Sequence, residues 1–134
     1  MATKPVASAI TEDEDLFAFG SILRRFDLIT QLDEAPALTV FAPTNAAFTR
    51  MLSERSYALA EPTGGVRLVE RHVLVGRLSP AELPGTHPTL AGAAVSVASQ
   101  HGDLVVDGTA RVICSGVTTT NAVVYVIDAV LDEG

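Results

Sequence analysis

The chain has 134 residues, of which 48% are hydrophobic and 19% are charged, and this composition excludes a disordered protein. A net charge of -7 argues against nucleic acid as the main partner, because phosphate binding needs a basic surface. No apolar run approaches the ~20 residues of a membrane span, and the length predicts one domain over residues 1–134.

The first 35 residues are predicted to be helical. Thr11, with Glu14 three residues later, has the pattern of a capping box, and acidic residues 12–15 stand where the helix dipole favours anions. Apolar residues at spacings of three and four then predict one buried stripe, made of Leu16, Phe19, Leu23 and Phe26. Leu28, Ile29 and Leu32 predict a second short helix.

The middle of the chain is predicted to hold one short strand and further helices. Residues 38–41 are rich in β-formers and end at Pro43, after which Thr44 is a candidate N-cap for a helix that contains Phe48. Ser79 and Glu82 have the pattern of a second capping box, which predicts a short helix before Pro84.

Strands are predicted from residue 86 onward. Val95 and Val97 alternate with small residues, Asp107-Gly108 is a strong hairpin signal, and residues 123–127 form a continuous apolar run typical of a buried strand. Helices early in the chain and strands late indicate an α+β fold.

Three segments resemble the motifs of the fasciclin domain family, in particular its single-domain bacterial members. They are residues 38–48 (LTVFAPTNAAF), 71–76 (RHVLVG) and 121–131 (NAVVYVIDAVL), and together the match spans nearly the whole chain. The resemblance implies a compact β-sandwich or wedge with helices packed along one side. It also implies cell adhesion, or attachment to a protein, matrix or carbohydrate partner.

Most motif positions are expected to maintain the fold, because strand formers, caps and turn residues dominate them. Asp128, at the end of the last strand, is expected to accept backbone hydrogen bonds from a loop. The motif positions are Thr39, Phe41, Pro43, Thr44, Asn45, Phe48, His72, Asn121, Tyr125 and Asp128.

Two positions depart from the family pattern. Arg71 stands where a Tyr usually precedes His72, and Tyr125 stands where the closing motif often has His. The stretch before Asn121 lacks the Asp-Ile pair linked to integrin contact in some animal members, so integrin binding does not carry over.

The sequence predicts no catalytic residue, no metal site and no cofactor. The three histidines, His72, His87 and His101, are far apart, and His72 is expected to be buried and hydrogen-bonded at a junction between a helix and a strand. The single Cys114 lies on an alternating strand and is expected to pack as a small hydrophobe.

Five of the nine basic residues fall within residues 50–77. They predict either a basic face toward an anionic partner or ligand, or scattered surface arginines paired with Glu54, Glu61 and Glu70. These arginines are Arg50, Arg55, Arg67, Arg71 and Arg77.

Two functions remain open. The first is a non-catalytic binding or adhesion module. The alternative is an intracellular domain that binds a small molecule, or an enzyme recruited from the fold, such as a cyclase that acts by shape in an apolar pocket. The first residues lack an apolar signal core, so the chain is expected to be extracellular or in the envelope if an export signal has been removed, and cytoplasmic if it is full length.

Overall fold

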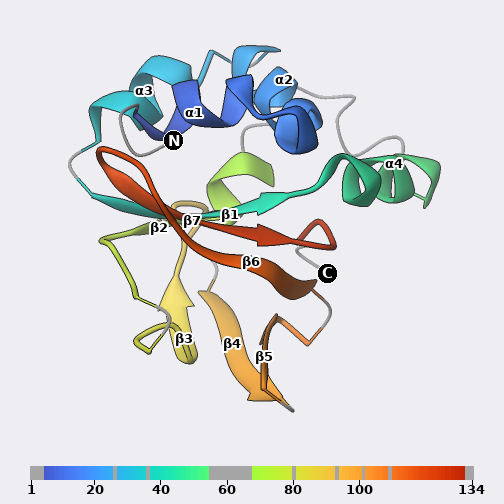
Figure 1. Ribbon diagram of the computed structural model, residues 1–134, viewed down its shortest axis with the longest axis vertical. Coiled ribbons are helices and arrows are strands. Elements are labelled where there is room, and N and C mark those ends of the chain that lie inside the picture. The colour runs from blue at the N-terminus through green and yellow to red at the C-terminus, as the bar shows by residue number, and fades with distance from the viewer. Residues whose placement is uncertain are drawn as a thin grey trace.

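Figure 1 shows a computed structural model of the chain. It describes residues 5–25, 27–35, 37–54, 68–79, 81–92, 94–100, 102–108 and 110–131, without the side chains of residues 51–54 and 114–117.

Helices fill the N-terminal part, as predicted. They are α1 (Val6–Glu12), the 3-10 helix η1 (Glu14–Leu16), α2 (Phe17–Arg25) and α3 (Ile29–Glu34). Leu16, Phe19 and Leu23 of the predicted stripe are fully buried, while Phe26 lies outside the described residues.

The capping box predicted at Thr11 is wrong. Thr11 lies inside α1, and its hydroxyl donates to the carbonyl of Ser8 at 2.9 Å. The side chain of Asp13 instead caps the next turn by accepting from the N–H of Asp15 at 2.9 Å. Helix α1 begins earlier than the local sequence indicates because distant side chains satisfy its first N–H groups.

One seven-stranded sheet contains all the strands that the structure describes, in the order β2-β1-β7-β6-β5-β4-β3. Strands β1 and β7 pair in parallel, and every other neighbouring pair is antiparallel. The strands are β1 (Leu38–Pro43), β2 (Val73–Val75), β3 (Gly85–Pro88), β4 (Ala94–Gln100), β5 (Asp103–Val106), β6 (Ala110–Thr118) and β7 (Ala122–Ile127), and α4 (Asn45–Glu54) follows β1.

The sheet separates two apolar cores, which gives the α+β wedge that was predicted. Helices α1 to α3 cover one face of β1 and β7 (Figure 1), and Phe19, Val40 and Val124 lie in the core between them. The other face curls over a second core that contains Tyr125 and residues of β4 and β5. An isolated bridge between Leu74 and Thr89 brings β2 to the end of β3, so the sheet is nearly closed.

Two predictions about turns had different outcomes. The hairpin at Asp107-Gly108 is confirmed, with φ values of 53° and 72° between β5 and β6. The helix predicted after Ser79 is wrong. Glu82 does accept from the Ser79 N–H and hydroxyl, which lowers the pKa of Glu82, but residues 81 and 82 form only a turn. Leu83 is buried in the second core, and Pro84, which is exposed, disfavours a helical conformation at the residue before it. The chain therefore enters β3 before a helix can continue.

None of the described helices is long and apolar enough to cross a membrane.

Helices α1 and α2 meet closely at Gly20. A Cβ atom built there would lie 2.9 Å from Cα of Thr11 and 3.5 Å from the carbonyl oxygen of Ile10. Because the first contact is with backbone, no side-chain rotation relieves it, and the two helices would have to separate.

We therefore expect Gly20→Ala to destabilise the protein by about 1–3 kcal/mol through overpacking. Helix propensity alone predicts the opposite sign, a gain of about 1 kcal/mol. Urea unfolding measures the difference, with Ser21→Ala on the same helix as the control for propensity. A Gly20→Ala protein as stable as the wild type would contradict the close approach.

Candidate functional site

His72 lies at the turn between the helical residues 68–71 and β2, and its side chain is fully buried. Its Nδ1 lies 2.6 Å from the carbonyl oxygen of Leu68, and its Nε2 accepts from the N–H of Leu131 at 2.9 Å. The carbonyl requires the proton on Nδ1, and the N–H requires a lone pair on Nε2, so the ring is neutral. His72 thereby joins β2 to the chain segment that follows β7.

The pKa of His72 is lowered from 6.5 to about 4, mainly because the ring is buried; the bond to the Leu68 carbonyl opposes this shift, and the charge of Arg71 adds to it. An imidazole held neutral with both nitrogens bonded to backbone groups is a structural element. Its nitrogens are not free to move a proton for a substrate.

Arg71 is buried and pairs with Asp107 in the β5–β6 hairpin, with its Nη2 3.0 Å from Oδ2. The other oxygen of Asp107 accepts from the N–H of Ser96 in β4 at 2.9 Å. The ion pair therefore connects the segment before β2 with the far half of the sheet. This contact accounts for the Arg at a position where the family pattern has Tyr.

Tyr125, the second departure, is also buried, and its hydroxyl donates to the carbonyl of Leu78 at 2.6 Å. Burial raises the pKa of this hydroxyl, and the nearby carboxylate of Glu82 adds to the shift. Thr39 holds the same segment, because its hydroxyl donates to the Gly76 carbonyl at 2.7 Å and accepts from the Leu78 N–H at 2.9 Å. The ring of Phe41 lies 6.0 Å from that of Tyr125 beneath the segment.

Asn121 connects helices α1 and α3 to the start of β7. Its Oδ1 accepts from the N–H of Val6 at 2.9 Å, and its Nδ2 donates to the carbonyls of Leu32 at 2.8 Å and Ala35 at 2.9 Å. The side chain is buried, so water cannot replace these partners.

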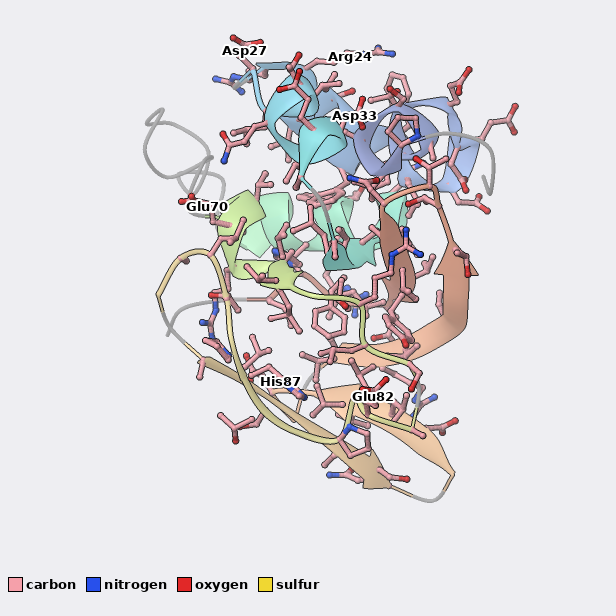
Figure 2. All side chains as sticks on the ribbon, turned by 90° about the vertical axis from the view of Figure 1, so that its left-hand side faces the viewer. Arg24, Asp27, Asp33, Glu70, Glu82 and His87 are labelled. Carbon is pink, nitrogen blue, oxygen red and sulfur yellow. The ribbon has the colours of Figure 1, made fainter. Side chains whose placement is uncertain are left out.

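Sequence analysis missed Asp33, which completes the same junction (Figure 2). Its carboxylate accepts from the N–H groups of Ala7 at 2.8 Å and Ser8 at 3.1 Å, and from the Ser8 hydroxyl at 2.6 Å. Asp33 caps α1 from α3, 25 residues away along the chain. No pattern within a single helix signals such a contact.

Thr44, Asn45 and Phe48 place α4 against α2. Thr44 caps α4 by accepting from the N–H of Ala47 at 3.2 Å. Asn45 accepts from the N–H of Ala18 at 2.8 Å, and Phe48 stacks on Phe19 with 6.0 Å between ring centroids. Pro43 ends β1 opposite Ile127 of β7.

Asp128 follows β7 and accepts from the backbone N–H of Arg111 at 2.7 Å. Arg50 of α4 donates to the carbonyl of Asp128 at 2.6 Å. At the opposite end of β7, Arg77 donates to the carbonyl of Thr120.

The described arginines therefore do not gather in one place. Arg71 is buried, while Arg50 and Arg77 are exposed at opposite ends of β7. Arg55 and Arg67 lie outside the described residues, as do His101 and the side chain of Cys114. A partner role for the five arginines stays a prediction.

One face of the sheet is uncovered in the described structure, and we call it the outer sheet face. Figure 1 shows β3, β4 and β5 on the side of β1 and β7 away from α1, α2 and α3. Val95 and Val97 point into the second core, whereas the residues that alternate with them are exposed. By register, the outward positions are Thr86, Pro88, Ala94, Ser96, Ala98, Gln100, Asp103, Val105, Arg111 and Ile113.

The outer sheet face carries little charge although the chain as a whole is acidic. Its charged residues are Asp103 and Arg111, which are both exposed and form an ion pair with 3.8 Å between Oδ2 and Nε. Ile113 is 54% exposed beside them. Two other large apolar side chains, Phe17 on α2 and Val75 on β2, are exposed away from this face.

The polar side chains described above do not form a reactive group. Most of them are bonded to backbone atoms, and Arg71 pairs with the carboxylate of Asp107. No three or more His, Cys, Asp or Glu side chains in the described part of the chain could hold a metal ion. The arrangement suits holding segments together.

Comparison with known proteins gives the family. The model of the fasciclin domain matches residues 14–133. The chain belongs to the fasciclin domain family. In a solved structure of a FAS1 domain pair from the insect cell adhesion molecule fasciclin I, this chain aligns over 97% of its length and 51% of the other chain, with a TM-score of 0.83 and 18% identity. That likeness shows that the fold is the same.

Bacterial relatives share more of the sequence. The immunogenic protein MPB70 of Mycobacterium bovis is 38% identical over 137 residues, which cover 98% of this chain and 70% of the relative. The cell surface glycolipoprotein MPB83 of the same species is 37% identical, and the chain spans 61% of its length. Protein sll1483 of Synechocystis is 34% identical over 123 residues.

We expect Asn121→Ala to cost about 2–4 kcal/mol, because it removes the side-chain partner of the Val6 N–H and of the Ala35 carbonyl, and one of two partners of the Leu32 carbonyl. Chemical unfolding measures the loss. Thr120→Ala, at the exposed neighbouring residue, is the control and should stay within about 0.5 kcal/mol of the wild type. Equal stability of the two variants would contradict the role given to Asn121.

The lowered pKa of His72 predicts how stability depends on pH. The unfolded chain takes up a proton near pH 6.5, whereas the folded chain does so only near pH 4, so stability is full above about pH 6.5 and is lost as the pH falls toward 4. Between pH 7 and 4.5 the wild type should lose about 2 kcal/mol more than His72→Gln. Urea unfolding of the wild type and of His72→Gln at both pH values measures this, and an equal loss in the two proteins would contradict the role given to His72.

Proposed function

We propose that the chain is a non-catalytic binding module of the fasciclin type, and that it contacts a protein partner through its outer sheet face. The observation that carries the proposal is the face itself, because it spans four strands, is exposed and is almost free of charge. Exposed apolar or neutral areas of this kind mark interaction sites on proteins.

The chemistry of the face favours a protein over the other partners that the family suggests. The face offers little attraction to a charged polymer, because its two charged residues form one ion pair and neutralise each other. A carbohydrate would find no aromatic side chain to stack on among the ten outward residues. Small side chains such as Ala94, Ser96 and Ala98 let another protein surface approach closely, and Ile113 offers an apolar contact.

The interior supports a binding role over the enzymatic alternative. His72, Arg71 and Tyr125 are the buried titratable side chains named above, and each is bonded to another part of the fold. A recruited enzyme would need such groups to face a substrate.

We also propose that residues 1–134 form one domain and that it acts outside the cell or in the envelope. The first part is supported by the family match over residues 14–133. The second is supported by a relative that is named a cell surface glycolipoprotein.

Attachment to intact cells tests the function. Beads coated with the purified protein should be retained on cells of the organism that encodes the chain more than beads coated with serum albumin. Ile113→Asp and Ala98→Glu should reduce retention at least tenfold, because each places an unpaired charge in the contact. Gln31→Glu, at an exposed position of α3, adds the same charge elsewhere and should have no effect.

Retention no greater than with albumin would overturn the binding function. Retention that survives both outer-face substitutions and is lost with Arg77→Glu would overturn the choice of face and move the contact to the arginines.

A further inference from the structure

We propose that residues 128–131 form a latch over the end of the second core, and that acid opens this latch by protonating His72. We call these residues the C-terminal latch. The proposal goes beyond the binding function and does not depend on it.

The last link of the latch is a hydrogen bond that only a neutral imidazole can accept. The N–H of Leu131 donates to Nε2 of His72 at 2.9 Å, and both residues are buried, with exposed fractions of 1% and 0%. The Nδ1 proton is already committed to the carbonyl of Leu68 at 2.6 Å. A second proton on the ring must therefore sit on Nε2, where it points at the N–H of Leu131.

The first link of the latch is different and does not involve the imidazole. The backbone N–H of Asp128 donates to the carbonyl of Arg111 at 3.1 Å, and the side chain of Asp128 accepts from the N–H of Arg111. The carbonyl of Asp128 accepts a hydrogen bond from the side chain of Arg50. Protonation of His72 therefore acts on the Leu131 end, while β7 remains paired with β1 and β6 along its length.

Among the described residues, the surroundings of the ring do not compensate a positive charge. The charged side chains on its own segment are Glu70 and Arg71, and Arg71 opposes protonation. Across the ring, α2 presents the aromatic face of Phe19, with centroids 5.9 Å apart. On the latch, the carboxylate of Asp128 accepts a hydrogen bond from the backbone N–H of Arg111. The free-energy cost of a positive charge on His72 therefore falls when the latch moves away and water reaches the ring.

Opening separates Leu131 from the second core, in which it is buried with Tyr125 and Ile127. Acid would thereby uncover apolar surface at the end of the wedge and free the chain that follows β7, while the sheet stays intact.

Native-state hydrogen exchange of the wild-type protein tests the latch. At pH 4.5 compared with pH 7, the protection of the Leu131 amide, corrected for its intrinsic exchange rate, should fall roughly 50-fold, as expected for a pKa near 4 in the closed state and 6.5 in the open state. The opening should be local. The exchange of Leu131 should change little with added urea, whereas the amide of Val124 in β7 should show the full urea dependence of global unfolding.

Two variants assign the effect to the imidazole. In His72→Gln the protection of Leu131 should be the same at both pH values. In Asp128→Asn, which keeps an acceptor oxygen and removes the negative charge, the 50-fold change should persist. If His72→Gln does not fold, the wild-type urea series still decides.

The proposal is overturned if the Leu131 amide exchanges with the same free energy and urea dependence as Val124, because the segment then opens only when the whole domain unfolds. It is also overturned if the protection of Leu131 does not change with pH, or if the change is lost in Asp128→Asn.

Discussion

The parallel pairing of β1 with β7 is the constraint on which the rest of the structure depends. These two strands are the second and third in the sheet order, and they carry both cores, since Val40 and Val124 face the helices while Phe41 and Tyr125 face the second core. A central strand that is buried on both faces allows one register, because a shift by one residue would exchange the contents of the two cores. The helices and the curled half of the sheet are placed by reference to this pair.

Polar side chains complete what the cores leave unspecified. Asn121 and Asp33 hold the helices, Arg71 reaches the far hairpin, and His72 closes the end after β7. In each case a side chain satisfies backbone groups or a charge of a distant element, and all of these side chains except half-buried Asp33 are buried. Such contacts are costly to leave half-made, so they select one arrangement of elements that apolar packing alone would hold loosely. Because these side chains are already bonded within the fold, we expect a partner to contact other residues, at the surface.

Much of the fold could be predicted from the sequence because its signals are local. Apolar periodicity placed the stripe of α2 and the strands β4 and β7, and Asp107-Gly108 placed a hairpin. The start of α1 could not be predicted, since the cap comes from Asp33 on another helix. The Ser79 and Glu82 pair predicted a helix that is not there: its local hydrogen bonds form, but the chain enters β3 before a helix can develop. Among the site residues, the pattern indicated that His72 would be buried and bonded, but its partner Leu131 is 59 residues away and only the fold brings them together. Their spacing in the sequence likewise could not predict that Arg50 and Arg77 lie at opposite ends of β7.

The pairing of β1 with β7 also has a consequence for how the chain reaches its structure. β1 ends at residue 43, and its parallel neighbour begins at residue 122, so these two strands must close a loop formed by residues 44–121, more than half of the chain, before either core is complete. Contacts of such long sequence separation slow folding, since the entropy of closing the loop is lost before the contacts compensate for it. During synthesis, the helices and β1 emerge first and must wait for the last strand. The N-terminal half therefore exposes its apolar face for most of that time, and a chain that stops before β7 has no native core to form.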